Sequence, residues 1–179
     1  GSLEWARAIG GTGADTGRGV AVDGDGFIYV GGGFQGQVDF DPGAGQRMLG
    51  SAGAHDGFVM KLGPTGDFRW AHAIGSTGSD EIRAMAADDA GNVYVGGVFS
   101  GTVDFDVGAG TRPLVARGAT DGFVAKYGPV GELSWALQFG RSGEAGVNAL
   151  ATVADGSVLV AGNYRGEVDA DPGAGERVL

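Results

Sequence analysis

The chain repeats itself every 65 residues, without insertion or deletion, over its whole length of 179 residues. Its three tryptophans, Trp5, Trp70 and Trp135, mark the period, and Leu179 aligns with Leu114. A fixed period of this length indicates one supersecondary unit used several times, each copy burying its apolar faces against its neighbours. Any function is therefore to be sought in residues that the copies share.

Composition indicates a folded protein made of strands. The 39 glycines lie between runs of Val, Ile, Phe and Tyr, as expected for short strands joined by tight turns. The absence of cysteine excludes disulfides and thiolate metal sites. No apolar run approaches the ~18 residues of a membrane span. No signal-peptide pattern opens the sequence, so we expect any export signal to lie outside it.

The formal net charge of −10 excludes two classes of partner. Nucleic acids and anionic membranes are bound through clusters of Lys and Arg, which this sequence lacks. An acidic surface suits divalent cations, or it serves solubility alone. Both interpretations of the charge stay open at this point.

One repeat contains four short apolar segments bounded by turn residues. In the first complete copy we expect strands at 19–23, 27–30, 56–61 and 68–74, the last with counterparts at 3–9 and 133–139. The runs show no polar alternation, which is typical of strands covered on both faces. Four such antiparallel strands describe a blade of a β-propeller. The predicted fold is an all-β, β-propeller-like array of four-stranded antiparallel blades.

Several short motifs carry a family resemblance. They are Ala-Val-Asp at 21–23, Gly-Asn-Val-Tyr-Val-Gly-Gly at 91–97, Asp-Gly-Phe-Val-Ala-Lys at 121–126 and Gly-Glu-Leu-Ser-Trp at 131–135. This pattern resembles the SBBP-type β-propeller repeat of bacterial exported proteins, over essentially the whole chain. The resemblance implies this fold, a secreted or cell-surface location and no known catalytic residues.

The sequence departs from that pattern in two places. A long insertion, at 35–55 in the first complete copy, separates the second and third strands. In the last copy, Val153 and Leu159 stand where the other copies have Asp and Tyr.

The repeat divides the chain into four parts. Residues 1–18 are expected to hold the fourth strand of a preceding blade, 19–83 and 84–148 two complete blades, and 149–179 a partial blade. The 11 predicted strands lack one third strand, because the chain is 16 residues short of three full periods.

Propellers close with about 4 to 8 blades. The chain is therefore either an excerpt of a longer array or a unit that neighbouring molecules complete as a ring or a filament. The expected partners are further copies of the same repeat, joined by β-strand completion.

Pairs of aspartates form the main chemical candidate. Asp39 and Asp41 are two residues apart on an extended segment, so their carboxylates point to the same side while Val38 and Phe40 turn inward. Ca²⁺ would neutralise such a pair with hard oxygen ligands. Alternatively, the carboxylates accept backbone N–H groups in a tight turn. The same pairs recur at Asp104, Asp106, Asp169 and Asp171.

Other candidates have less support. His55 and His72 are the only histidines and have no counterparts in the other copies, which argues against a zinc or catalytic role. Lys61 and Lys126 are expected to pair with local acids or cap strand edges. The tryptophans are expected in the core rather than on a sugar-stacking surface.

The sequence favours a non-enzymatic, extracellular or cell-surface bacterial repeat protein with a structural or adhesive role. Stabilisation of this protein by Ca²⁺ is part of the same hypothesis. The alternative is a glycan-binding propeller lectin, because such lectins place one ligand pocket in each blade.

Overall fold

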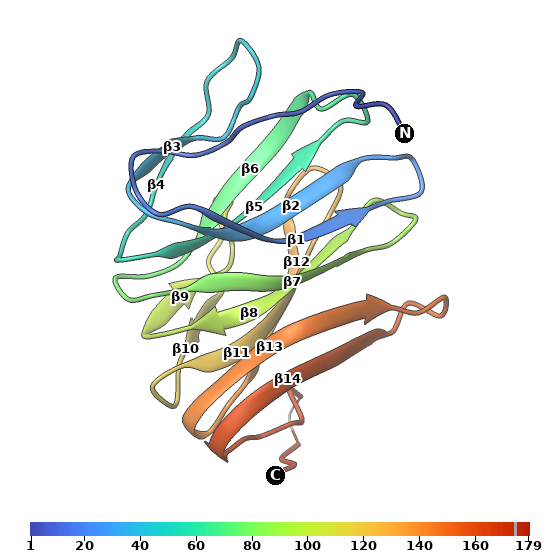
Figure 1. Ribbon diagram of the computed structural model, residues 1–179. Coiled ribbons are helices and arrows are strands. Elements are labelled where there is room, and N and C mark those ends of the chain that lie inside the picture. Colours follow the sequence, from blue (N-terminus) through green and yellow to red (C-terminus); the bar gives the residue numbers. More distant parts are fainter. Residues whose placement is uncertain (174) are drawn as a thin grey trace.

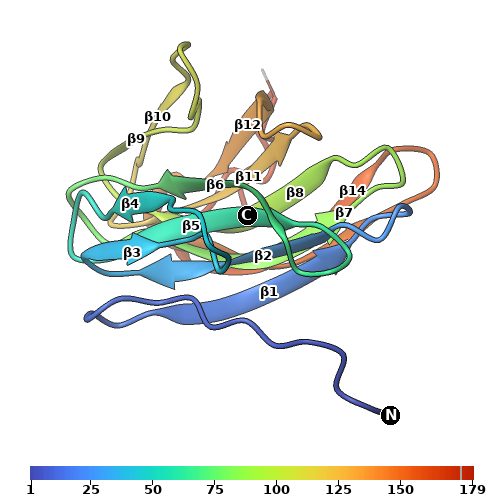
Figure 2. The same ribbon diagram turned by 90° about the horizontal axis from the view of Figure 1, so that it is seen from above.

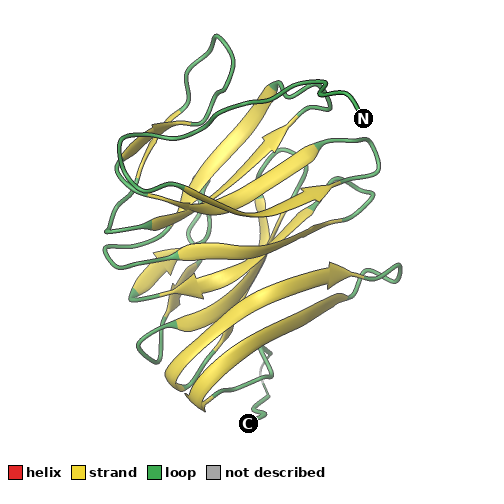
Figure 3. Ribbon diagram, in the orientation of Figure 1, coloured by secondary structure: helices red, strands yellow, loops and turns green. Residues whose placement is uncertain are grey.

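The computed structural model describes residues 1–173 and 175–179. All regular secondary structure in these residues is β, and every strand pairing in the sheets is antiparallel (Figure 3). The described part of the chain holds no helix that could cross a membrane. The prediction of an all-β antiparallel protein is confirmed.

Two four-stranded sheets and a terminal hairpin follow one another down the molecule in Figure 1. Each sheet keeps its repeat's strands in chain order. The first sheet consists of β1 (Thr16–Val22), β2 (Ile28–Phe34), β5 (Asp56–Leu62) and β6 (Phe68–Ile74). The second consists of β7 (Glu81–Ala87), β8 (Val93–Phe99), β11 (Asp121–Tyr127) and β12 (Leu133–Phe139). The terminal hairpin consists of β13 (Ser142–Thr152) and β14 (Val158–Glu167).

The insertion between the second and third strands of each unit is itself a small hairpin. Strands β3 (Gln37–Asp39) and β4 (Met48–Gly50) pair in the first unit, and β9 (Thr102–Asp104) and β10 (Pro113–Val115) in the second. Figure 2 shows β9 and β10 projecting from the sheets. Three-residue strands that flank a Gly-rich loop give only a weak signal in the sequence. The 11 predicted strands therefore do not include these four.

The N-terminal segment corrects one prediction. Residues 3–9, expected to be a strand, form no regular secondary structure. Among the described residues no third strand lies beside this segment, so it has no ladder to join. Trp5 nevertheless lies against the turn at Gly66, as Trp70 lies against the turn at Gly131. Trp5 therefore occupies the place on its neighbouring unit that Trp70 of the fourth strand occupies on the next.

Apolar side chains fill each unit and the space between the sheets. In the second unit, the hairpin residue Phe105 meets Phe99 of β8 and Phe123 of β11, with ring centroids 5.6 Å and 4.8 Å away. All three rings are at most 1% exposed, and they share one core cluster with Val59 and Ile74 of the first sheet. The same triplet in the first unit is Phe34, Phe40 and Phe58.

We predict that Phe105→Ala lowers the free energy of unfolding by about 3–5 kcal/mol, because it leaves a cavity between two sheets that cannot collapse freely. Urea unfolding followed by tryptophan fluorescence measures the loss. The exposed Val115, replaced by Ala, is the matched control and should change stability by less than about 0.5 kcal/mol. A loss of under 1 kcal/mol for Phe105→Ala would contradict the packing described here.

Candidate functional site

The aspartate pairs lie in the loops of the inserted hairpins and bind the backbone of those loops. Oδ1 of Asp39 accepts the N–H groups of Asp41 and Arg47, at 3.0 Å and 2.8 Å. Oδ1 of Asp41 accepts the N–H of Gly43 at 2.8 Å. The first carboxylate thus ties the two ends of the loop together, and the second holds its tip.

The other two copies repeat these bonds. Asp104 accepts from Asp106 and Arg112, and Asp106 from Gly108, at 2.7–3.0 Å. Asp169 accepts from Asp171 and Arg177, and Asp171 from Gly173, at 2.8–3.0 Å. The two backbone N–H groups lower the pKa of the Asp169 carboxyl, because they stabilise its charged form.

The second carboxylate also explains the second glycine of each loop. A Cβ at Gly45 would collide with Oδ2 of Asp41, and one at Gly110 with Oδ2 of Asp106. The carboxylate lies over the loop backbone so closely that only glycine fits beneath it. The Asp-x-Gly-x-Gly spacing is therefore explained by the loop itself.

The structure supports the two interpretations of the aspartate pairs, turn capping and Ca²⁺ binding, to different degrees. The bonds to loop N–H groups are those expected of turn-capping carboxylates. Val38 and Phe40 point inward, as expected, and are 1% exposed. Among residues 1–173 and 175–179, no three His, Asp or Glu side chains gather as a metal site would require. Binding of Ca²⁺ by these pairs stays a prediction.

A second polar cluster lies inside the sheets, where Asp23, Tyr29 and Lys61 meet. The Tyr29 hydroxyl donates to Oδ2 of Asp23 at 3.0 Å, and Nζ of Lys61 lies 3.7 Å from the same oxygen. Lys61 is 4% exposed and also lies over the Tyr29 ring, 4.9 Å from its centroid. Burial, with Asp23 beside it, raises the pKa of the Tyr29 hydroxyl.

This cluster joins the first sheet to the second. The Tyr29 hydroxyl lies 2.7 Å from the carbonyl oxygen of Gly91, in the turn between β7 and β8. Nζ of Lys61 and Nε1 of Trp70 lie 3.4 Å and 3.1 Å from the carbonyl oxygen of Pro129, in the turn between β11 and β12. Two turns of the second sheet are thereby fixed on the first.

Sequence reasoning placed Asp23 in a hairpin turn and paired the lysines with local acids, but it did not join them to the tyrosine. The signal was present, because Tyr29 and Lys61 recur one period later. In the second unit, Tyr94 donates to Asp88 at 3.0 Å and Lys126 lies 3.6 Å from Asp88. The terminal hairpin has Val153 and Leu159 at these positions and so lacks the cluster.

The two histidines lie in different surroundings. His55 forms a bridge with Ser79, at the junction of the two sheets. His72 lies between the rings of Trp70 and Tyr127, with centroids 5.1 Å and 6.4 Å away. Within the described residues, its buried Nε2 has no hydrogen-bond partner. Burial, with Arg47 nearby, lowers the pKa of His72.

The four-stranded antiparallel sheets and their repeated contacts are similar to the blades of a β-propeller. Residues 4–32 match the family model of SBBP, the beta-propeller repeat, and the match confirms the resemblance seen in the sequence.

Two curated relatives were found. An uncharacterized WD repeat-containing protein of Acanthamoeba polyphaga mimivirus is 26% identical over 190 residues, which cover 93% of this chain and 14% of that protein. The regulatory protein FlaEY of Caulobacter vibrioides is 30% identical over 139 residues, which cover 72% of this chain and 15% of FlaEY. The chain thus spans a small part of each relative.

We predict that acid destabilises the junction of the sheets through His72. Its folded-state pKa lies below the usual 6.5, so the unfolded chain binds the proton more readily. Stability from the neutral ring is fully present above pH 6.5 and is lost as the pH falls below it. Urea unfolding at pH 7.5 and pH 5 measures the loss, which should be smaller in His72→Phe. An equal loss in both proteins would contradict the assignment.

For the loops, we predict that Asp104→Ala costs about 1 kcal/mol of stability, because two N–H groups lose their acceptor. Asp104→Asn keeps an acceptor oxygen and should cost less. Thermal melts of the unmodified chain and of both variants, with Ca²⁺ and with a chelator, separate the two roles. Turn capping predicts that each protein has the same melting temperature in both conditions. A Ca²⁺-dependent rise in the unmodified chain that is smaller in Asp104→Asn/Asp106→Asn would instead establish an ion site.

Proposed function

We propose that this chain is a non-enzymatic, structural or adhesive section of a β-propeller-type array at the bacterial cell surface, and that the repeated hairpin loops make its contacts. The observation that carries the proposal is that the repeated polar groups bond to the protein's own backbone and side chains. The aspartate pairs shape projecting loops, and the Asp23-Tyr29-Lys61 cluster holds the first two sheets together, so these polar groups build a surface.

The loops suit such a role by their exposure and their rigidity. Residues 43–47 and 108–112 are exposed in both complete units. Capping by the aspartates fixes the loop backbone before any contact forms, which reduces the entropic cost of binding. The acidic charge and the family resemblance support a location outside the cell.

The test of this proposal combines location and adhesion. Antibodies against the chain should label intact cells of the native organism as strongly as permeabilised ones. Beads coated with the chain should adhere to those cells, and Ala44→Arg/Ala109→Arg, which alters two exposed loop tips, should reduce adhesion at least several-fold. Val130→Arg, at an exposed turn between β11 and β12, is the matched control. Labelling only after permeabilisation would refute the proposed location.

A glycan-binding role is the second candidate, and a polar groove favours it. A cavity of about 330 Å³ lies between the hairpin of the second unit and the loop of the terminal one. Arg112, Arg117, Gln138, Asp169 and Asp171 line it, together with Leu114 and Pro172. Charged and amide groups beside small apolar patches suit sugar hydroxyls and ring faces.

We predict that, if the groove binds glycans, an oligosaccharide array will show binding that Gln138→Ala weakens at least several-fold. Gln138 is the residue to change because Asp169 and Arg112 also shape the loops. A thermal melt of Gln138→Ala checks that loss of its bonds to Val115 and Asp121 leaves the fold intact. Gln35→Ala, at an exposed amide outside the groove, is the matched control. Binding that survives Gln138→Ala, or no binding to any glycan, would argue for the structural or adhesive role.

A further inference from the structure

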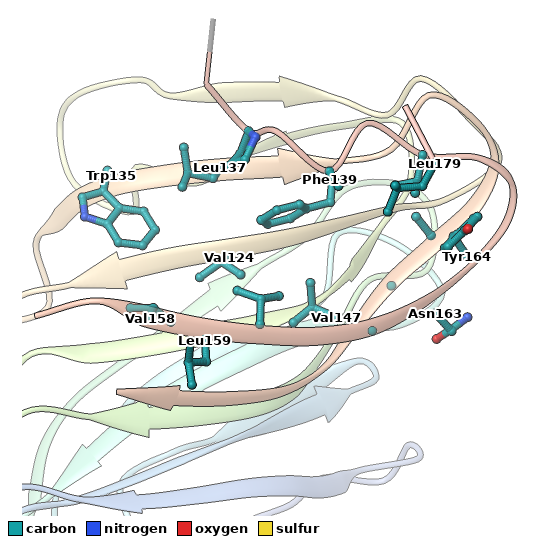
Figure 4. A pocket seen from close by; sticks show the side chains of 17 residues that line it. Val124, Trp135, Leu137, Phe139, Val147, Val158, Leu159, Asn163, Tyr164 and Leu179 are labelled. Atoms are coloured by element: carbon teal, nitrogen blue, oxygen red, sulfur yellow. The ribbon is translucent and has the colours of Figure 1, made fainter. Parts of the chain in front are cut away.

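An apolar groove runs between β12 and β14, with a volume of about 520 Å³ (Figure 4). Trp135, Leu137 and Phe139 of β12 form one wall, and Val158 and Tyr164 of β14 lie across from them. Val168, Ala170 and Leu179, from the segment after β14, also line the groove.

The repeat itself shows that this groove is incompletely filled. Val160 and Tyr164 are 41% and 49% exposed, whereas their counterparts in β8, Val95 and Phe99, are 0% and 1% exposed. The difference follows from strand pairing. Strand β8 pairs with β7 on one side and β11 on the other, while β14 pairs with β13 alone in the described part of the chain.

In the second unit, β11 fills the corresponding space. Phe123, Ala125 and Tyr127 alternate along this strand and are at most 1% exposed. The Phe123 ring lies 6.2 Å from Phe99 and 4.8 Å from Phe105, and the Tyr127 hydroxyl donates to the Phe105 carbonyl at 2.9 Å. The counterparts of Phe99 and Phe105 are Tyr164 and Ala170, and both line the groove.

We propose that the groove is the docking site for the third strand of a further repeat, which pairs with the free edge of β14 and inserts its alternating apolar side chains between β14 and β12. The site repeats, between the second sheet and the terminal hairpin, the interface formed between the first and second sheets. Strand addition supplies main-chain hydrogen bonds, and the alternate side chains supply specificity. The inference rests on the proposed role as a section of an array and names the partner of its open end.

The repeat also fixes the register of the docked strand. Lys126 of β11 lies opposite Tyr94 of β8, and the counterpart of Tyr94 is Leu159. The incoming residue equivalent to Lys126 therefore lies opposite Leu159. Leu159 is among the residues that line the groove, and it is 62% exposed, so a thiol introduced at this position is accessible to a docked strand (Figure 4).

The docked strand need not carry the lysine of β5 and β11. In both complete units that lysine lies beside an aspartate and over a tyrosine ring. Val153 and Leu159 provide neither partner in the terminal hairpin. An apolar residue opposite Leu159 forms a better cross-strand pair than lysine there.

The test uses the whole chain and a synthetic peptide with the sequence of residues 115–140, which supplies a third and a fourth strand. Because the chain contains no cysteine, Leu159→Cys introduces a single thiol. A peptide with Lys126→Cys should form a disulfide with it, since opposite residues come within disulfide range. A peptide with Val124→Cys presents its thiol on the same face, two residues out of register, and should cross-link at least tenfold more slowly. Equal cross-linking of the two peptides, or none, would overturn the proposal.

Titration of the fluorescently labelled peptide tests the groove itself. Phe123→Asp in the peptide, or Tyr164→Asp in the chain, should weaken binding at least tenfold, because each places a charge in the apolar space. Val22→Asp, at another exposed apolar position in β1, is the control for the chain and should bind normally. Lys126→Leu in the peptide should bind at least as tightly as the unmodified sequence.

Unchanged binding by Tyr164→Asp, or weaker binding by the Lys126→Leu peptide, would overturn the assignment. To guard against misfolding of Tyr164→Asp, the Phe123→Asp peptide tests the same contact on the unmodified chain. Strand docking and bead adhesion are separate measurements, so either proposal can fail without the other.

Discussion

Phe105 of the inserted hairpin and Phe123 of the second sheet share one core with Val59 and Ile74 of the first sheet, and this contact between neighbouring units is the interaction on which the remaining structure depends. Burial of each such side chain contributes about 1.5–3 kcal/mol. A single four-stranded sheet of this sequence would leave that surface in water on two sides. The strands are apolar on both faces for this reason, and each unit requires a neighbour.

Two kinds of polar group, the Asp-Tyr-Lys cluster and the aspartate pairs, add specific bonds to this apolar packing. The Asp-Tyr-Lys cluster is buried at the junction, where an unpaired lysine would be costly, and its partners come from the same unit and from two turns of the next. It therefore fixes the position of one sheet on another, which apolar packing alone does less well. The aspartate pairs act locally, shaping loops that project from the sheets. The aspartates therefore have a structural role at both sites.

The period and the apolar runs were enough to predict the sheets, their antiparallel order and the inward-facing Val38 and Phe40. The small hairpins were missed because three-residue strands such as β3 depend on the buried Phe40 and on the Asp39 bonds rather than on strand propensity. The strand at 3–9 was predicted wrongly because a sequence repeat conveys side-chain placement, not whether a ladder partner is present. Tyr29 was overlooked because its carbonyl partner lies 62 residues away along the chain.

The terminal hairpin differs from the other two units in a way that follows from the same physics. Aspartate and tyrosine at the first and second strands are favourable where a lysine on the third strand and a turn of the next unit complete their bonds. Val153 and Leu159 remove the need for both. The substitution therefore removes the Asp-Tyr-Lys link from the terminal hairpin. Strand β14 keeps the alternating apolar residues that face the second sheet, so the apolar packing between the hairpin and that sheet is retained without the polar contacts.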